Sequence, residues 1–434
     1  MEQLLHYTWR HKMLPLKALT TTDGREVEVI DPGLYNRRNA GPDFFNAKVR
    51  IAGTLWVGNV EIHDKASDWY AHGHDRDPRY DSVMLHVVGR ADAEVTTSSG
   101  QRLPQMELSV PENVRANYEQ LLRCDKYPPC YQIIHSLSHL TVHAWMAAMQ
   151  TERLEQKTEA IRQRAEKMNG SWEDAYFVTL ARNYGFGING DAFEQWAQAI
   201  PSAAVGKHRD DLFQLEAIFM GQAGLLDIQS IPERHRKAAL DDDYFVRLQR
   251  EYNYLAHKFS LQPIDFRLWH FLRLRPHNFP HIRIAQLVNL YYSRRAGLSA
   301  LIECTTLEQL RQLMLTHVTP YWETHYNFGC TSAPSRKQLS AASADLIIIN
   351  TAIPVLFAVG RHRQKDELCD RAFDLLEQLR PEKNHIITLW QECGLDVKSA
   401  GDSQALIQLK REYCDKRECL RCRFGYEYLR TNNQ

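Results

Sequence analysis

The sequence has no excess of charge of either sign. Its 53 Lys and Arg residues equal its 53 Asp and Glu residues, so the formal net charge at pH 7 is zero. A strongly basic chain attracts nucleic acid or anionic membranes over its whole surface, and this composition excludes such a global field. Any binding to DNA or RNA must therefore come from a local group of basic side chains.

The chain also lacks a long uninterrupted apolar run. Its most apolar stretch, ADLIIINTAIPVLFAVG at 344–360, is interrupted by Asn350, Thr351 and Pro354 and is too short and polar for a typical membrane span. The first residues, MEQLLHYTWRHKMLPL, lack the basic start and small-residue cleavage site of a signal peptide. We therefore expect a cytoplasmic protein without membrane contact, whose nine cysteines are reduced thiols or metal ligands.

No repeat of fixed period and no low-complexity segment is present. Residues 1–115 combine an opening helix with short alternating strand-like runs, whereas residues 116–434 have the apolar spacing of helices. We predict an α+β fold, with an N-terminal α/β domain over 1–115 and a large all-α region over 116–434. Helices are expected over 136–168, 171–184, 208–225, 235–258, 282–295, 304–316, 337–358, 365–379 and 403–411.

Three metal-capable side chains lie near the ends of two neighbouring strand-like runs. Asp43 precedes FFNAKVRI, and Glu61 and His63 end TLWVGNVEIH. A three-residue hairpin loop would pair Ile51 with Leu55 and place the three side chains on one face. A two-residue loop would move Asp43 to the other face. With the longer loop we predict a catalytic site for Mg²⁺ or Mn²⁺; the alternative is solvated strand ends.

The next segment carries further histidines. His72 and His74 form a His-x-His pattern, which together with His63 and an acid is a second way to hold a metal, here zinc. The alternative is a surface loop built on the turn residues DRDP. His86 interrupts an apolar run, so we expect either a core histidine or, with His74, an accessory member of the site.

The C-terminal stretch YCDKRECLRC contains Cys414, Cys419 and Cys422 in a C-x4-C-x2-C pattern. Thiols this close in a cytoplasmic protein predict a Zn²⁺ site or an iron–sulfur cluster, and the alternative is unrelated free thiols. The fourth ligand is not in this stretch. The candidates for it are Cys124, Cys130, Cys330, Cys393 and a histidine.

Residues 266–295 contain no acidic residue and interleave arginines with aromatic side chains. Arg273, Arg275 and Arg283 surround a turn broken by proline, and we predict that they bind the phosphate backbone of DNA or RNA. The alternative is that they pair with acids elsewhere, because the chain is neutral overall.

The stretches GPDF and GNVEIH together resemble the motif of the PD-(D/E)XK nuclease superfamily, in which an Asp precedes one strand and acidic-x-Lys lies on the next. The resemblance covers about residues 1–110 and implies a restriction-endonuclease-like domain with Asp43 and Glu61 on the metal. His63 stands where these enzymes have a Lys that activates water. This departure implies a histidine base or ligand, or a domain that no longer cleaves. Glu2 is similar to the helix acid that some of these enzymes add.

Over nearly its full length the chain also resembles the domain-of-unknown-function 2851 family of bacterial proteins. The matching stretches include GPDFFNAKVRI, LWVGNVEIH, LRLRPHNFPHIRIAQ, YWETHY and YCDKRECLRC. The two resemblances together lead us to expect a metal-dependent, nuclease-like protein that acts on or binds nucleic acid. A non-catalytic binding or scaffold protein with the same fold is one alternative, and a metal-dependent hydrolase of small phosphoesters is another.

Overall fold

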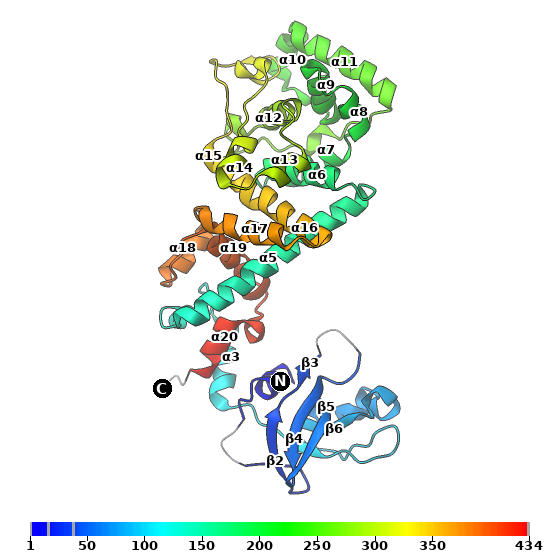
Figure 1. Cartoon of the computed structure of the whole chain (residues 1–434), viewed down its shortest axis with the longest axis vertical. Helices are drawn as coiled ribbons and strands as arrows, with labels where there is room; N and C mark the ends of the chain where they lie inside the picture. Colours follow the sequence, from blue (N-terminus) through cyan, green and yellow to red (C-terminus); the bar gives the residue numbers. More distant parts are fainter. Residues whose placement is uncertain (1, 15–17, 37–39, 432–434) are drawn as a thin grey trace. The chain divides into compact units, whose positions relative to one another are not determined.

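The computed structural model describes residues 2–14, 18–36 and 40–431, and it divides into two compact units (Figure 1). The first unit comprises Met1–Val142, Glu392–Leu395 and Leu409–Gln434, and the second comprises His143–Gln391 and Asp396–Gln408. The mixed α+β character predicted from the sequence is confirmed, with the large sheet in the first unit and mainly helices in the second. The first unit continues past residue 115 and also includes the C-terminal segment.

The first unit is built around a seven-stranded sheet with the order β1-β2-β4-β5-β6-β7, in which β3 also pairs with β4 (Figure 1). Neighbouring strands from β1 to β5 are antiparallel, while β6 is parallel to β5 and β7 is parallel to β6. The strands are β1 (Leu19–Thr20), β2 (Glu26–Asp31), β3 (Leu34–Tyr35), β4 (Phe44–Ile51), β5 (Thr54–Lys65), β6 (Val83–Arg90) and β7 (Gln105–Glu107). Helix α1 (Glu2–Arg10) packs on β5 and β6.

The predicted three-residue loop between β4 and β5 is wrong. Ile51 pairs with Thr54, so the loop is Ala52-Gly53. Both loop residues have positive φ, 48° and 82°, as the tight turns that suit the twist of a hairpin require. The sequence did not show this turn because Ala rarely adopts positive φ, and the usual signature for it is Asn-Gly or Asp-Gly.

A β-bulge in β4 reverses the consequence of this shorter loop. Ala47 pairs with Gly58, but Phe44 pairs with Val60, so the register moves by one residue between the two pairs. Within the bulge Asn46 has a φ of 55°, and its backbone N–H donates to the side chain of Asn59 over 3.2 Å. An extra residue in one strand exchanges the faces of all residues beyond it. The bulge therefore returns the residue before Phe44 to the face that carries Glu61.

A crossover joins the parallel strands β5 and β6, as parallel pairing requires. It contains α2 (Asp68–Ala71), the short 3₁₀ turns η1 (His74–Arg76) and η2 (Pro78–Tyr80), and the two histidines of the His-x-His pattern. Trp69 anchors this crossover, since its side chain is fully buried and its Nε1 donates to the carbonyl of Thr96 over 2.9 Å. The crossover is therefore a fixed part of the unit, and it covers one end of β5.

The rest of the first unit is helical. The C-terminal segment contains a π-helical turn η8 (Leu409–Cys414), a 3₁₀ turn η9 (Cys419–Arg421) and α20 (Arg423–Arg430). Helix α20 packs against α3 (Glu112–Arg123), as Figure 1 shows, and also against α4 (Tyr131–Ile134). The side chain of Asn117 on α3 donates to the carbonyls of Tyr428, Leu429 and Thr431 over 3.2, 3.3 and 2.9 Å. Asn117 is buried, so these bonds fix the end of α20 on α3.

Helices α6 to α19 and most of α5 form the second unit around one large hydrophobic core. The predicted helix over 171–184 is confirmed, whereas the one predicted over 235–258 is two helices, because the side chain of Asp242 caps the second at the backbone N–H of Tyr244. The helices are α5 (His139–Lys167), α6 (Trp172–Tyr184), α7 (Gly190–Gln198), α8 (Ser202–Lys207), α9 (Leu212–Gln222), α10 (Glu233–Leu240), α11 (Asp243–Phe259), α12 (Pro280–Tyr292), α13 (Leu298–Glu303), α14 (Leu307–Met314), α15 (Ala341–Ile347), α16 (Ile353–Arg363), α17 (Asp366–Gln378), α18 (His385–Glu392) and α19 (Ala400–Gln408).

The most apolar helical stretch lies inside this core. Ala341–Arg363 is long and apolar enough to cross a membrane by length and composition, with a mean hydropathy of 1.9, but 72% of its apolar window is buried within the protein. A helix that is apolar all round and enclosed by other helices is typical of the centre of a large helical unit. The apolar composition of this stretch is therefore explained by its position in the core of the second unit.

Candidate functional site

The two predicted acids lie together at one end of the sheet. Asp43 is the residue before β4, and its backbone N–H donates to Glu61 Oε2 over 3.0 Å. In return, the backbone N–H of Ile62 donates to Asp43 Oδ2 over 2.9 Å. This exchange fixes both carboxylates and leaves Oε1 of Glu61 facing the crossover histidines.

Burial dominates the electrostatics of this pair. Burial raises the pKa of the Glu61 carboxyl, and the neighbouring Asp43 raises it further. The pKa of Asp43 is raised as well by burial, although His6 on α1 opposes the shift from 3.5 Å away. Two acids held close together with little water are stabilised by a cation between or beside them. The local electrostatics therefore suit a metal ion.

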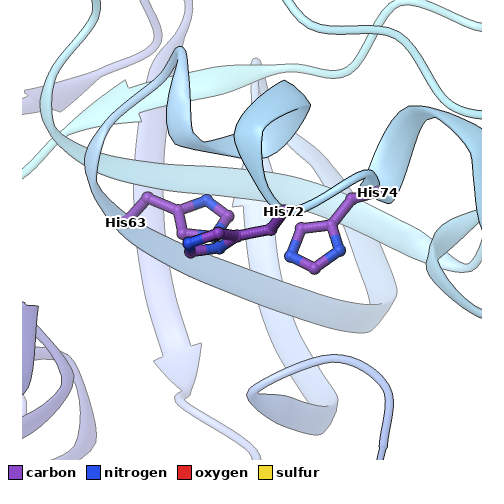
Figure 2. Close-up of side chains that lie close together, drawn as sticks. All are labelled: His63, His72 and His74. Carbon is purple, nitrogen blue, oxygen red and sulfur yellow. Dashed lines mark hydrogen bonds between the residues drawn. The ribbon is translucent and has the colours of Figure 1, made fainter.

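Three imidazoles gather beside Glu61, and two of them lie close to its Oε1. His63 comes from β5, while His72 and His74 come from the crossover, and their ligand atoms all lie within 4.8 Å of one another. Figure 2 shows the three rings gathered side by side. Nε2 of His63 is 3.1 Å from Nδ1 of His72. Oε1 of Glu61 is 3.7 Å from Nε2 of His63 and 3.3 Å from Nε2 of His74.

These separations match the edges of a small coordination shell. Ligands at 2.0–2.1 Å around a tetrahedral ion are about 3.3–3.4 Å apart. A donor set of three nitrogens and one oxygen suits Zn²⁺ or Mn²⁺, whereas Mg²⁺ prefers oxygen ligands. The residues present therefore fit a transition-metal ion held by His63, His72 and His74, with Glu61 beside two of them. On this geometry Asp43 lies behind Glu61 as its support.

The rings are held in place by a second layer of side chains. Nε2 of His86, which is fully buried on β6, lies 2.9 Å from Nδ1 of His63. The ring of Tyr80 stacks on His74 with centroids 3.7 Å apart, and Trp69 contacts His74 edge-on at 5.3 Å. Metal-binding histidines commonly have their second nitrogen fixed in this way. His86, predicted as a core or accessory histidine, is in the core and contacts the cluster.

The cluster histidines with shifted pKa values are held in the form that binds metals. Burial, together with the neighbouring histidines, lowers the pKa of His63 to about 2. Burial, together with His74, lowers the pKa of His86 to about 3. Burial also lowers the pKa of His74. Neutral imidazole is the metal-binding species, so these rings need not lose a proton at physiological pH before they bind an ion. His72 is exposed and opens the cluster to solvent.

The other predicted site residues lie elsewhere. The predicted nucleic-acid-binding arginines Arg273, Arg275 and Arg283 belong to the second unit. Arg273 and Arg275 are exposed, but Arg283 is only 6% exposed and donates to Gln286 and Asn278. This burial lowers its pKa to about 10, and its side chain supports the interior of the second unit. Cys414, Cys419 and Cys422 are buried in the first unit.

Sequence reasoning missed His6, and it offered the exposed His72 only in an alternative zinc site or as part of a surface loop. His6 lies between Glu2 and Asp43, with Nε2 3.9 Å from Glu2 Oε1 and 3.5 Å from Asp43 Oδ2. The four-residue spacing of Glu2 and His6 on one helix face was the available signal. Glu2, the predicted helix acid, thus reaches the site through this histidine.

Comparison with known proteins gives one informative result. No curated protein and no solved structure matches the chain significantly. The family model described as "Protein of unknown function (DUF2851)" matches residues 2–385, which confirms the resemblance to that family. The matched region includes every residue of the histidine–carboxylate cluster and ends before the C-terminal cysteines. This chain belongs to the DUF2851 family.

Proposed function

We propose that this protein is a metal-dependent hydrolase whose metal ion is held by His63, His72 and His74 together with Glu61. The observation that carries the proposal is the convergence of His63, His72 and His74, whose ligand atoms all lie within 4.8 Å of one another. Beside them, Oε1 of Glu61 lies 3.3 Å from His74 and 3.7 Å from His63. A bound divalent ion would supply a water of lowered pKa and would stabilise charge on a phosphoryl oxygen.

The protein residues around the ion have separate tasks in this proposal. Asp43 holds Glu61 in place through its backbone N–H, and His86 fixes the ring of His63. His72 is on the exposed side, so it borders the path by which a substrate would approach. His6 lies against Asp43 at the edge of the cluster, with its Nε2 3.5 Å from Oδ2 of Asp43.

We propose a nucleic-acid phosphodiester as the substrate. Two observations support this choice. Asp43 ahead of β4 and Glu61 on β5 have the positions that the nuclease-like motif implies, although His63 replaces the usual Lys. In addition, a groove lined by His6 runs past basic side chains, which can hold phosphates along a backbone. These basic residues are Arg10, Lys416, Arg417 and Arg421, with Glu418 on the same wall.

A non-catalytic role is the second candidate, and one observation favours it. Structural zinc sites have four protein ligands, whereas catalytic sites keep a position open for water. If Glu61 stays bound with all three histidines, the ion has no open position. The same cluster would then stabilise the fold of a protein that binds nucleic acid without cutting it.

The test combines metal content with turnover. Protein loaded with Mn²⁺ or Zn²⁺ is incubated with single-stranded DNA, duplex DNA, RNA and a small chromogenic phosphodiester. We expect one metal ion per chain at the cluster, cleavage of at least one nucleic acid, and loss of both in His74→Ala and Glu61→Gln. His139→Ala is the matched control, because His139 is an exposed histidine at the start of α5.

The outcomes separate the candidates. Metal binding with salt-sensitive nucleic-acid binding but no cleavage would favour the non-catalytic role. Turnover of the small phosphodiester alone would move the substrate class to small phosphoesters. Metal content unchanged in His74→Ala would overturn the cluster itself.

A further inference from the structure

Four buried cysteines gather in the first unit from two distant parts of the chain. Cys130 precedes α4, Cys414 ends η8, Cys419 begins η9, and Cys422 precedes α20. Their exposed fractions are 6, 9, 7 and 7%, and none of these four cysteines forms a disulfide. The proposed hydrolase function uses none of them, and they lie outside the histidine–carboxylate cluster.

The two segments that carry these thiols are fixed against each other. The hydroxyl of Tyr428 on α20 donates to Gln132 on α4 over 3.3 Å. Arg417, in the loop between Cys414 and Cys419, donates to the carbonyls of Leu121 and Cys124 over 3.2 and 2.8 Å. The C-terminal thiols are thus held beside the segment that contains Cys130.

The backbone between Cys419 and Cys422 forms a tight turn. The N–H of Cys422 donates to the carbonyl of Cys419 over 3.2 Å. Gly425 then packs so closely that a Cβ at this position would lie 2.2 Å from the same carbonyl oxygen. A side chain at position 425 would therefore force the Cys419–Cys422 turn open. Tight turns of this kind bring two thiolates to one centre in metal-binding sequences.

Burial distinguishes Cys130 from the other cysteine candidates for the fourth ligand. Cys130 is buried, whereas Cys124, Cys330 and Cys393 are only partly buried. Burial raises the pKa of the Cys130 thiol most, and the charges of Cys422, Cys414 and Cys419 each raise it further. The other candidates for a fourth ligand have different surroundings. Cys330 lies in the second unit, Cys124 donates to the carbonyl of Lys126, and Cys393 is influenced by Lys126 and Glu392.

We propose that Cys130, Cys414, Cys419 and Cys422 ligate a metal centre that ties the C-terminal segment to the loop before α4. Four buried thiols on two segments that are fixed against each other offer a donor set of sulfurs only, which suits zinc or an iron–sulfur cluster. The centre would hold the ends of the Asp415–Glu418 loop. That loop contributes Lys416 and Arg417 to the basic groove.

The four sulfurs do not form a group as compact as the three histidines. In the part of the chain that the structure describes, the histidine group is the one set of metal-capable side chains whose ligand atoms all lie within 4.8 Å of each other. A single tetrahedral zinc would bring four sulfurs to about 3.8 Å. An iron–sulfur cluster distributes the thiolates over several irons and spaces them more widely. We therefore expect iron and sulfide at this centre.

The test uses full-length protein purified without oxygen. Iron, acid-labile sulfide and zinc are measured per chain, together with the absorption spectrum. We expect iron, sulfide and a broad absorption near about 400 nm. Cys130→Ser should lose them, whereas Cys393→Ser, the matched cysteine control, and His74→Ala should keep them. The last variant separates this centre from the proposed hydrolase site.

Each outcome decides the proposal. Stoichiometric zinc that is lost in Cys130→Ser supports the four-thiolate centre and overturns its assignment to a cluster. Protein without metal at this centre, or with equal metal in Cys130→Ser, overturns the proposal. If Cys130→Ser does not fold, alkylation of folded wild-type protein decides instead. The four thiols should become reactive only after a chelator removes the metal, and unchanged reactivity contradicts their coordination.

Discussion

His86 gives the sharpest test of how the histidine cluster is organised. It is fully buried, and its Nε2 lies 2.9 Å from Nδ1 of His63. With that nitrogen engaged, His63 presents Nε2 to His72 and Glu61. Which nitrogen of a histidine binds a metal is set by the hydrogen bond that the other makes. The substitution His86→Leu removes this hydrogen bond and fills the buried position with an apolar side chain of similar size.

The expected effect follows from burial and distance. Loss of a hydrogen-bonding partner behind a metal ligand typically weakens metal affinity about 10–100-fold. That range corresponds to about 1.4–2.7 kcal/mol of binding free energy. A buried nitrogen of His63 left without a partner also costs about 1–3 kcal/mol of folding stability. We therefore expect both a weaker metal complex and a modest fall in the free energy of unfolding.

The assay is competition with a chromogenic chelator, which gives the dissociation constant of the metal complex. His139→Leu controls for the loss of a histidine outside the cluster, and His86→Gln retains a group that can bond to His63. We expect the affinity for the metal to decrease in the order wild type, His86→Gln, His86→Leu. Wild-type affinity in His86→Leu, with metal binding abolished in His63→Ala, would refute the idea that His86 orients His63.

Three further predictions concern other parts of the molecule. Asn46→Val should lower the free energy of unfolding by about 1–2 kcal/mol and weaken metal binding, because a β-branched residue disfavours the φ of 55° that the bulge requires. Asn46→Gly should leave thermal unfolding nearly unchanged, because glycine adopts positive φ readily. Burial raises the pKa of Glu216 above 4.5, so stability conferred by its protonated form should fall as pH rises above 4.5. Glu216→Gln should therefore gain relative stability in urea unfolding as pH increases. Arg421→Gln should reduce the salt dependence of nucleic-acid binding by about one counterion.

Each of these has a clear contrary result. Equal metal affinity in the valine and glycine variants of Asn46 would show that the bulge does not position the acids. A pH-independent difference between wild type and Glu216→Gln would show that the carboxyl titrates alike in folded and unfolded protein. An unchanged salt slope in Arg421→Gln would remove this residue from the phosphate-binding groove.

The sequence predicted the helical content better than the strand register, for physical reasons. The start of the helix over 171–184 is signalled in the sequence by the N-cap residue Ser171, whose side chain accepts a hydrogen bond from the backbone N–H of Asp174. Positive φ at Ala52 and Asn46 has no equivalent signal, because neither residue type is reserved for that conformation. The two register changes offset each other, so Asp43 and Glu61 meet although the predicted pairing was wrong.

The site itself depended on tertiary structure in a similar way. Spacing identified His63, His72 and His74 as one way to hold a metal, but it did not show that a crossover between parallel strands folds the two loop histidines onto β5. Cys130 was one of several equal candidates for the fourth thiol. Its burial and the packing of α4 against α20 distinguish it, and that packing joins residues hundreds of positions apart in the chain.

The first unit combines segments from both ends of the chain, and this affects how it folds during synthesis. Its sheet and α3 leave the ribosome early, whereas Leu409–Gln434, which supplies the carbonyl partners of Asn117, is made last. Domains generally begin to fold as they emerge. The face of α3 that packs against α20 therefore stays exposed to solvent until the whole second unit has been translated. A chain that stalls or is cleaved before Cys414 would keep its histidine cluster yet expose that face, which marks it for chaperones or proteases.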